Sequence, residues 1–235
     1  MTGRDATWDI YSEVLRRVRE QNIRFAVGGG MAVGTYVPAR LSTKDIDLYV
    51  KPADRHAVIQ ILDDCGLRDY YEKSPYERHW IHRRYEGEAI VDVMWGMPNR
   101  RAYVDDGWLT RGPEIELNGE RMRILPPEEL IWAKLYVLQR DRSDWPDILN
   151  IMQATAPTLD WDHLIDRVGA DAPLLEALVS VFRWLSPARA SMIPASARRR
   201  LKEARRSTAS GIPHDDLLDT RPWFLPRLEQ ERKAC

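Results

Sequence analysis

The sequence predicts a mixed α/β domain over residues 1–125 and a helical domain over residues 126–235. In the first part, short apolar strand-like segments alternate with helical segments, which is typical of a sheet covered by helices. Strand-like pairs joined by tight-turn residues indicate that some of the strands are antiparallel. Beyond residue 126 the apolar side chains recur at helical spacing, which favours a helical domain.

The composition is that of a globular protein with a sizeable core. The 235 residues are 44% hydrophobic and include nine tryptophans, enough for one large or two small domains. No apolar run approaches the ~20 residues that cross a bilayer, and no signal segment is evident, so we expect a cytoplasmic protein. Cys65 and Cys235 make no disulfide framework. The net charge of −1 gives the whole molecule no bias toward nucleic acid or anionic membranes.

Periodicity and turn residues place the elements of the first half. We expect a helix at 7–21, a strand at 23–27, a helix at 30–37, a strand at 45–50 and a helix at 52–65. Thr7 stands at the capping position of the first helix, and Pro38 stops the second. Gly66 suits a left-handed cap at the end of the third helix.

The same signals place the later elements. We expect antiparallel strands at 78–85 and 88–95 and a hairpin at 114–124. A helix begins at about 126, and further helices are expected at 144–154, 160–168, 173–186 and 196–206. Asn118-Gly119 is the preferred pair for a type I′ turn. Pro127 with the acids after it favours a helix start, and Asp144 is the expected cap of the next helix.

The stretch 23–50 combines a glycine-rich turn with two closely spaced acids. Residues 28–30 are glycines between a strand and a helix start, where backbone N–H groups and the positive end of the helix dipole approach an anion closely. In the following strand, Asp45 and Asp47 share one face at a separation of about 7 Å. Such a pair suits Mg²⁺, which is held by one or two carboxylates together with substrate phosphates.

These features resemble the signature of the DNA polymerase β-like nucleotidyltransferase superfamily. That signature is a hydrophobic residue and a Gly-Gly pair followed by Asp-hydrophobic-Asp. In this chain it is Val27-Gly28-Gly29 followed by Asp45-Ile46-Asp47-Leu48. The resemblance covers about residues 20–155, and the long spacing between its two halves is similar to that in antibiotic and toxin-type nucleotidyltransferases. It implies a polymerase β-like core with a C-terminal helical domain.

Asp92 is a lone acid in the apolar segment 88–95. Because an unpaired buried carboxylate is costly, Asp92 is expected either in a salt bridge with an arginine or in a functional site. In the superfamily a third acid on a neighbouring strand completes the metal site, and Asp92 matches it. The resemblance therefore implies that Asp45, Asp47 and Asp92 are catalytic and hold two Mg²⁺ ions. Asp92 is also the candidate to receive the proton of the acceptor hydroxyl.

The resemblance also implies a site for ATP or another NTP. The backbone of Gly28 and Gly29, with Ser42 or Thr43, would hold phosphate oxygens. Lys134 lies within an apolar stripe, where a lysine either extends to the rim or binds an anion. In related nucleotidyltransferases a lysine on the first helix after the catalytic sheet reaches the triphosphate, so that role falls to Lys134.

Two further sets of residues have weaker assignments. His82 and Arg84 share a strand face, which we expect to lie beside Asp92 on the acceptor side. Residues 140–144 loosely resemble a basic segment of the superfamily, and we expect them to be scaffold for a helix pair first. No Ser-His-Asp or Cys-His arrangement has a telling spacing, and the implied chemistry needs no protein nucleophile.

The implied reaction is transfer of a nucleoside monophosphate from an NTP to an acceptor hydroxyl. The acceptor stays open between a macromolecule, either tRNA or protein, and a small antibiotic. The alternative function is a non-catalytic nucleotide-binding module or one paired with an antitoxin. Six basic residues within 198–206, opposed only by Glu203, are either a solvated helix face or an RNA-binding patch.

Overall fold

The computed structural model describes residues 6–40, 45–97, 101–138 and 142–207. The chain divides into two compact units. Among the described residues, the first consists of residues 6–31, 45–97 and 101–124, and the second of residues 32–40, 125–138 and 142–207. The second unit thus includes a short piece of the N-terminal half. The domain limits predicted from the sequence stay a prediction.

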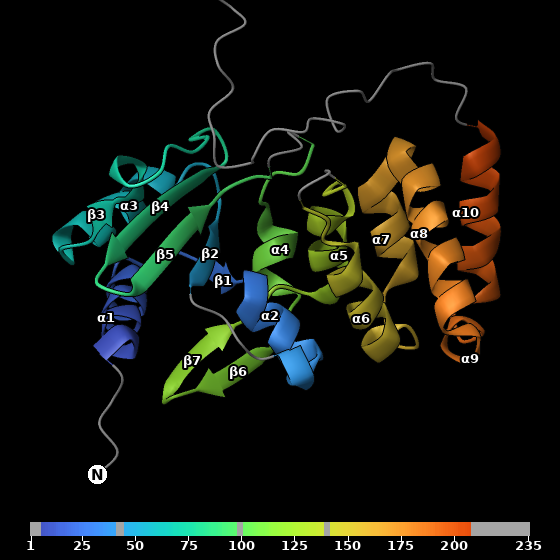
Figure 1. The fold of residues 1–235 in the computed structure, drawn as a ribbon, viewed down its shortest axis with the longest axis horizontal. Helices are drawn as coiled ribbons and strands as arrows, with labels where there is room; N and C mark the ends of the chain where they lie inside the picture. Colours follow the sequence, from blue (N-terminus) through green and yellow to red (C-terminus); the bar gives the residue numbers. More distant parts are fainter. Residues whose placement is uncertain (1–5, 41–44, 98–100, 139–141, 208–235) are drawn as a thin grey trace, which may run out of the picture. The chain divides into compact units, whose positions relative to one another are not determined.

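A five-stranded mixed sheet lies at the centre of the first unit (Figure 1). Its strands are β1 (Phe25–Val27), β2 (Ile46–Val50), β3 (Arg68–Asp69), β4 (Ile81–Glu86) and β5 (Ala89–Met94), in the order β1-β2-β5-β4-β3. β2 and β5 are parallel, and the other neighbours are antiparallel. The mixed α/β class expected from the sequence is confirmed.

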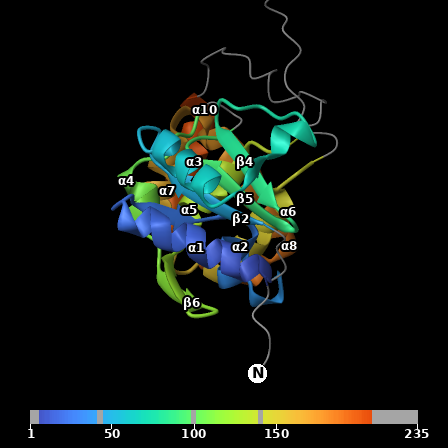
Figure 2. The ribbon, with the colours of Figure 1, turned by 90° about the vertical axis from the view of Figure 1, so that its left-hand side faces the viewer.

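Two helices cover one face of this sheet, α1 (Ala6–Glu20) and α3 (Arg55–Asp64) (Figure 2). Their apolar stripes are buried, and the buried residues are Trp8, Tyr11, Val14, Leu15 and Val18 of α1 and Val58, Ile61 and Leu62 of α3. Gly66 follows α3 with a φ of 83°, as expected for a left-handed position. Thr7 lies inside α1, which begins at Ala6, so the prediction of Thr7 as its cap is wrong.

The opposite face of the sheet is partly covered by the short helix α4 (Asp106–Thr110). Trp108 of α4 stacks on Tyr49 of β2 with ring centroids 5.6 Å apart. The hairpin of β6 (Glu114–Leu117) and β7 (Glu120–Arg123) follows α4. Asn118 and Gly119 both have positive φ, 50° and 85°, which confirms the predicted turn.

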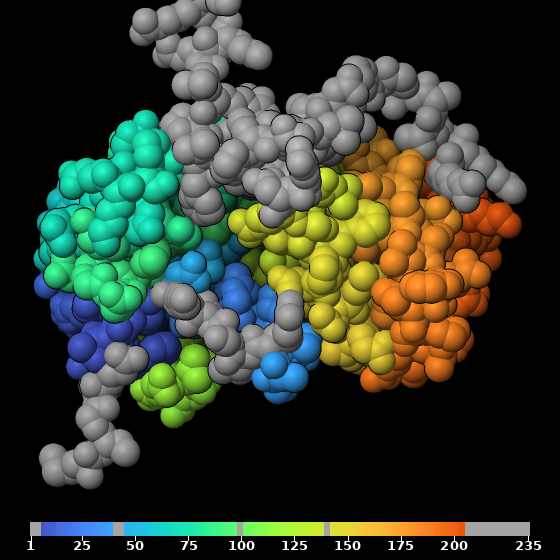
Figure 3. Space-filling view, in the orientation of Figure 1, coloured from blue at the N-terminus to red at the C-terminus, as the bar shows by residue number. Residues whose placement is uncertain are grey.

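The second unit is built from helices. They are α5 (Pro127–Leu135), α6 (Trp145–Thr155), α7 (Trp161–Val168), α8 (Ala172–Leu185), α9 (Pro187–Ala190) and α10 (Ala195–Ser207). Figure 3 shows their outer surface in colours from yellow-green to red. A buried glutamate links two of them, since Glu129 of α5 contacts His163 and Arg167 of α7 at 2.7 and 3.3 Å.

None of the helices that the structure describes is both long and apolar enough to span a membrane. The cytoplasmic location expected from the sequence stays a prediction.

Helix α2 (Gly29–Tyr36) connects the glycine-rich turn to the rest of the chain. It begins directly after β1 and ends before Pro38, where a short 3₁₀ turn (Pro38–Arg40) follows. The predicted stop at Pro38 is therefore confirmed. Its N-terminal residues belong to the first unit and its remainder to the second. The start of α2 is the part that bears on the site.

Candidate active site

Three neighbouring strands place charged side chains in one row. Asp47 of β2 is paired in register with Asp92 of β5, and Asp92 is paired with Arg83 of β4. Residues in register project from the same face of a sheet, so these three side chains lie next to one another. Asp45 precedes β2 by one position and shares the side of Asp47. We call Asp45, Asp47 and Asp92 the carboxylate row.

Arg83 binds the carboxylate row directly. Its Nε donates to Asp92 Oδ1 at 2.7 Å and its Nη2 to Asp92 Oδ2 at 2.5 Å. The same Nη2 lies 3.5 Å from Asp45 Oδ2. A two-pronged bond between a guanidinium and a carboxylate is among the strongest that side chains make. The salt bridge foreseen for Asp92 as one of two possibilities is therefore present.

Burial and charge act in opposite directions on the two partners. Asp92 is 1% exposed. Burial raises the pKa of its carboxyl, while the Arg83 hydrogen bond and charge lower it in part. For Arg83, burial lowers the pKa, but the carboxylates of Asp92, Asp45 and Asp47 outweigh burial and raise it. The Arg83 guanidinium is therefore always positively charged. Its charge stabilises the ionised form of the buried Asp92 carboxyl, which burial alone disfavours.

Gly29 makes room for Asp47. Its φ is 53°, and a Cβ built there would lie 1.6 Å from Asp47 Oδ2. No other residue type fits this position, because the backbone is left-handed and the space already holds a carboxylate. Gly28 donates its N–H to the backbone oxygen of Asp47 at 2.9 Å. The Gly28 amide is therefore already hydrogen-bonded within the fold. The predicted contact of backbone amides with phosphate then falls to Gly29 and the residues after it.

The prediction that His82 and Arg84 lie beside Asp92 is wrong. In β4, His82 pairs with Val93 and Arg84 pairs with Val91, so both project from the face opposite Asp92. Arg84 binds Asp63 at 2.8 Å, and His82 Nε2 lies 3.7 Å from Asp69 Oδ2.

Arg83 was missed although the sequence contained the signal. The β4–β5 turn pairs Glu86 with Ala89, leaving two residues between them. In any antiparallel pair with a two-residue turn, partner numbers add to an odd sum, so Asp92 must pair with an odd-numbered residue. Applied to segment 78–95, this parity selects Arg83 over its two neighbours.

Lys134 lies in α5 of the second unit and is already bound to acids. Its Nζ contacts Asp144 Oδ2 at 2.9 Å and Asp147 Oδ2 at 3.1 Å. Burial raises the pKa of Asp144, but Lys134 and Arg142 outweigh it and hold that pKa below its usual value. Asp144 is the residue before α6, yet its side chain makes no capping bond. The role of Lys134 on a triphosphate stays a prediction.

Two of the predicted phosphate contacts and part of the segment 140–144 lie outside the described part of the chain. Ser42 and Thr43 fall between the described ranges 6–40 and 45–97. Of residues 140–144, those from Arg142 onward are described, and Arg142 Nε lies 3.2 Å from Asp144 Oδ1. Their assignment to phosphate binding or to scaffold stays a prediction.

The carboxylate row suits a divalent cation in its chemistry, since Mg²⁺ prefers carboxylate oxygens. Asp45 and Asp47 share one side of the strand, and Gly29 leaves space for Asp47. Within the described residues, however, no group of three or more Asp, Glu, His or Cys side chains converges as metal ligands. Arg83 accounts for this, because it occupies both oxygens of Asp92. Asp45 and Asp47 therefore supply the kind of oxygen that such a cation prefers, while both oxygens of Asp92 are bound by Arg83.

Comparison with known families assigns the chain. Residues 5–186 match a family model described as uncharacterised nucleotidyltransferase. The chain belongs to this nucleotidyltransferase family. The superfamily expected from the Gly-Gly and Asp-Ile-Asp segments is thereby confirmed. No curated protein matches the sequence significantly.

One solved structure supports the nucleotidyltransferase fold, and two others are reported with it as similar. An antigenic nucleotidyltransferase-like protein from Paracoccidioides brasiliensis aligns with a TM-score of 0.51 at 17% identity, over 81% of this chain and 96% of that one. The antibiotic-resistance factor ANT(2'')-Ia aligns with a TM-score of 0.43 at 19% identity, over 77% and 92%. The lincosamide antibiotic adenylyltransferase LnuA aligns with a TM-score of 0.43 at 16% identity, over 63% and 97%.

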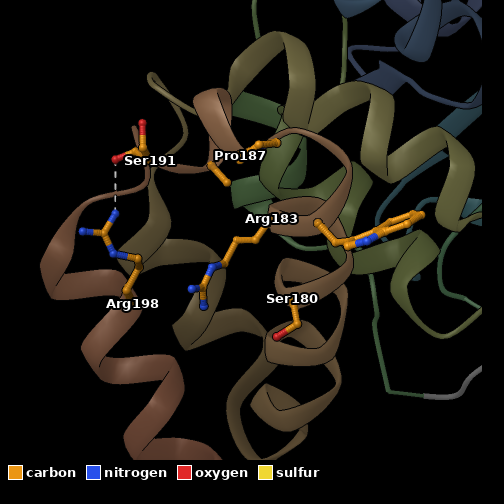
Figure 4. A pocket seen from close by; sticks show the side chains of 7 residues that line it. Ser180, Arg183, Pro187, Ser191 and Arg198 are labelled. Atoms are coloured by element: carbon orange, nitrogen blue, oxygen red, sulfur yellow. Dashed lines mark hydrogen bonds between the residues drawn. The ribbon is translucent and has the colours of Figure 1, made fainter.

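The second unit of this nucleotidyltransferase carries a basic hollow on its surface. It measures about 620 Å³ and is lined by Ser180, Arg183, Trp184, Pro187, Ala190, Ser191 and Arg198. Arg183 of α8 and Arg198 of α10 lie on two sides of it (Figure 4). Trp184 is 81% exposed. We call this set the α8–α10 hollow.

The basic residues of the predicted segment 198–206 make different kinds of contact. Arg200 is held in ion pairs with Asp162 and Asp166 of α7, at 2.5 and 2.6 Å. Arg198 bonds the backbone oxygens of Ser191 and Ile193. The side chains of Arg205 and Arg206 lie outside the described part of the chain. Arg200 therefore behaves as a bridge between α7 and α10.

Proposed function

We propose that this nucleotidyltransferase transfers a nucleoside monophosphate from ATP or another NTP to an acceptor hydroxyl at the carboxylate row, with release of pyrophosphate and of the hydroxyl proton. The observation that carries the proposal is the register of Asp47 with Asp92 across β2 and β5, with Asp45 on the same side. This register places acids from two strands together on a face that α1 and α3 leave free.

Each residue of the row has a proposed role. Asp45 and Asp47, which share one side of the strand, hold two Mg²⁺ ions, and Asp92 completes the site on the acceptor side. Bound Mg²⁺ supplies charge stabilisation to the phosphates and to the attacking oxygen. The amides at the start of α2, from Gly29 onward, bind phosphate oxygens because a helix N-terminus favours an anion. Ser42, Thr43 and Lys134 stay proposed contacts of the triphosphate.

For the acceptor, the α8–α10 hollow supports RNA over a small antibiotic. Two arginines line it, none of its described lining residues is acidic, and an exposed tryptophan lies beside them. Single-stranded nucleic acid is bound by this combination of positive charge and an aromatic platform. A cationic antibiotic would favour an acidic pocket instead, so we propose an RNA acceptor.

The test is an incubation of the purified chain with each labelled NTP and Mg²⁺, against total RNA, total protein and an antibiotic panel. We expect label in the RNA fraction. Label in the antibiotic or protein fraction would retain the transferase and change the acceptor. Nucleotide binding with no transfer in any fraction would favour the alternative, a non-catalytic nucleotide-binding module or one paired with an antitoxin.

A further inference from the structure

The carboxylate row carries more negative charge than a partly buried site tolerates by itself. Asp92 is almost fully buried, and the side chain of Asp45 is 32% exposed. Like charges held this close repel strongly where water is scarce. Arg83, 14% exposed, contacts Asp92 and Asp45 together. The Arg83 guanidinium therefore offsets the negative charge of Asp92 and Asp45.

Arg83 and a metal ion need the same lone pairs. Both oxygens of Asp92 accept hydrogen bonds from Arg83 at 2.7 and 2.5 Å, and the second donor also faces Asp45. A cation that uses Asp92 must displace at least one of these bonds. In this bound position the guanidinium carbon of Arg83 also lies 5.4 Å from the centre of the Tyr70 ring, so a cation–π contact accompanies the bonds to Asp92.

We infer that Arg83 is a built-in counter-cation of the carboxylate row, which holds Asp92 until a divalent cation displaces it. The inference rests on the proposed function, since it takes the row to be a cation site. Its consequence is a lowered affinity for metal, because the Arg83–Asp92 hydrogen bonds are lost each time a metal ion binds. A monovalent cation, with half the charge, competes poorly with a bidentate guanidinium.

The test measures binding of Mn²⁺ alone, by calorimetry and by electron paramagnetic resonance, with no nucleotide present. Arg83→Met removes the competing cation and keeps an unbranched side chain. Arg84→Met is the matched control, because Arg84 is the next residue of β4, is 12% exposed and is ion-paired on the opposite face. We expect Mn²⁺ to bind Arg83→Met about tenfold more tightly than the wild type or better, and Arg84→Met unchanged.

The outcomes separate the inference from the proposed function. If the wild type binds Mn²⁺ and Arg83→Met binds it equally or more weakly, Arg83 does not compete and the inference is overturned, while the metal site stands. If none of the proteins binds Mn²⁺, the inference is overturned and Arg83–Asp92 is a permanent structural salt bridge, while the transfer assay with NTP decides the proposed function separately.

A second measurement covers a failure of Arg83→Met to fold. The Nε–H resonance of Arg83 in the wild type, assigned with Arg83→Lys, is followed by NMR during a Mg²⁺ titration. We expect a saturable shift of this resonance and none for Arg84, because only Arg83 loses its carboxylate. An unmoved Arg83 resonance at saturating Mg²⁺ would overturn the inference.

Discussion

Gly29 and Asp47 depend on each other at the level of single atoms. A methyl group at residue 29 would overlap Asp47 Oδ2, and the backbone φ of 53° disfavours any side chain. We expect Gly29→Ala to displace Asp47, to lower the free energy of unfolding by about 1–3 kcal/mol and to weaken Mn²⁺ binding. Urea denaturation and calorimetry measure the two effects.

Gly87→Ala is the control that shows the effect of backbone strain without an overlap between the added methyl group and a carboxylate. Gly87 has a φ of 55°, almost the same as Gly29, but no atom lies within 4 Å of an added Cβ. We expect it to lose stability by strain and to bind Mn²⁺ like the wild type. Equal Mn²⁺ affinity in both alanine variants would show that the placement of Asp47 does not depend on Gly29.

His82 gives the first unit a pH dependence at the residue scale. Burial, and then the Arg84 guanidinium, lowers the pKa of His82 to about 4, although Asp69 opposes this shift. Between pH 6.5 and 4 the unfolded chain binds a proton that the folded chain does not, so stability falls as the pH falls. We expect His82 to account for a loss of about 1–3 kcal/mol over this range.

Urea denaturation at a series of pH values checks the assignment of that loss. His82→Gln should flatten the dependence, while His56→Gln should not, because His56 is exposed. The same slope in wild type and His82→Gln would assign the pH dependence to other groups.

At the scale of elements, α5 and α6 are tied by a partly buried ion pair. The lysine of α5, Lys134, faces Asp144 and Asp147, and its side chain is 13% exposed. Lys134→Ala leaves these acids without their partner, so we expect a loss of about 2–4 kcal/mol of unfolding free energy. The pKa of Asp144 is held low, so this stabilisation is present above pH 4 and is lost as the pH falls through the lowered pKa.

Comparing Lys134→Ala with Lys134→Met by thermal unfolding at pH 7 and pH 3 measures this contribution. The difference from the wild type should be largest at pH 7 and should shrink as the pH falls below the usual range of an aspartate. A rise in stability at pH 7 would mean that Lys134 was an unfavourable charge on an apolar stripe.

The elements that the sequence predicted well are those with enough residues to show a period. The helices from α5 to α10, except the short α9, and the β6–β7 hairpin lie within a few residues of the expected ranges. The strand β3 and the helices α4 and α9 were missed, because segments of two to five residues display no period.

The shared side of Asp45 and Asp47 was predictable from the sequence, whereas the identity of the basic residues that bind the acids was not. Asp45 and Asp47 follow from alternation in one strand. Arg83 depends on register between strands, and the partners of Lys134 depend on how one helix packs on another. Neither is visible in local periodicity.

At the scale of the whole molecule, the net charge is near zero, so any binding of RNA depends on local patches of positive charge. If RNA binds the α8–α10 hollow, Arg183→Gln with Trp184→Ala should weaken RNA binding and reduce its salt slope by about one unit. Arg200→Gln is the control, since Arg200 is occupied by two acids of α7. Filter binding of RNA across a salt titration measures both.

NTP binding should be unchanged in these variants. Wild-type RNA binding in the double variant at every salt concentration would move the RNA site elsewhere or favour a small-molecule acceptor.

The measurement that bears most directly on the proposed function is Mg²⁺-dependent transfer of labelled nucleoside monophosphate by Asp45→Asn, Asp47→Asn and wild type. We expect each substitution to reduce transfer by more than about 100-fold, because a charge-stabilising group contributes several kcal/mol to the transition state. The thermal midpoint should stay near that of the wild type, since neither side chain is fully buried. Wild-type transfer by both folded variants would contradict the assignment of the reaction to the carboxylate row.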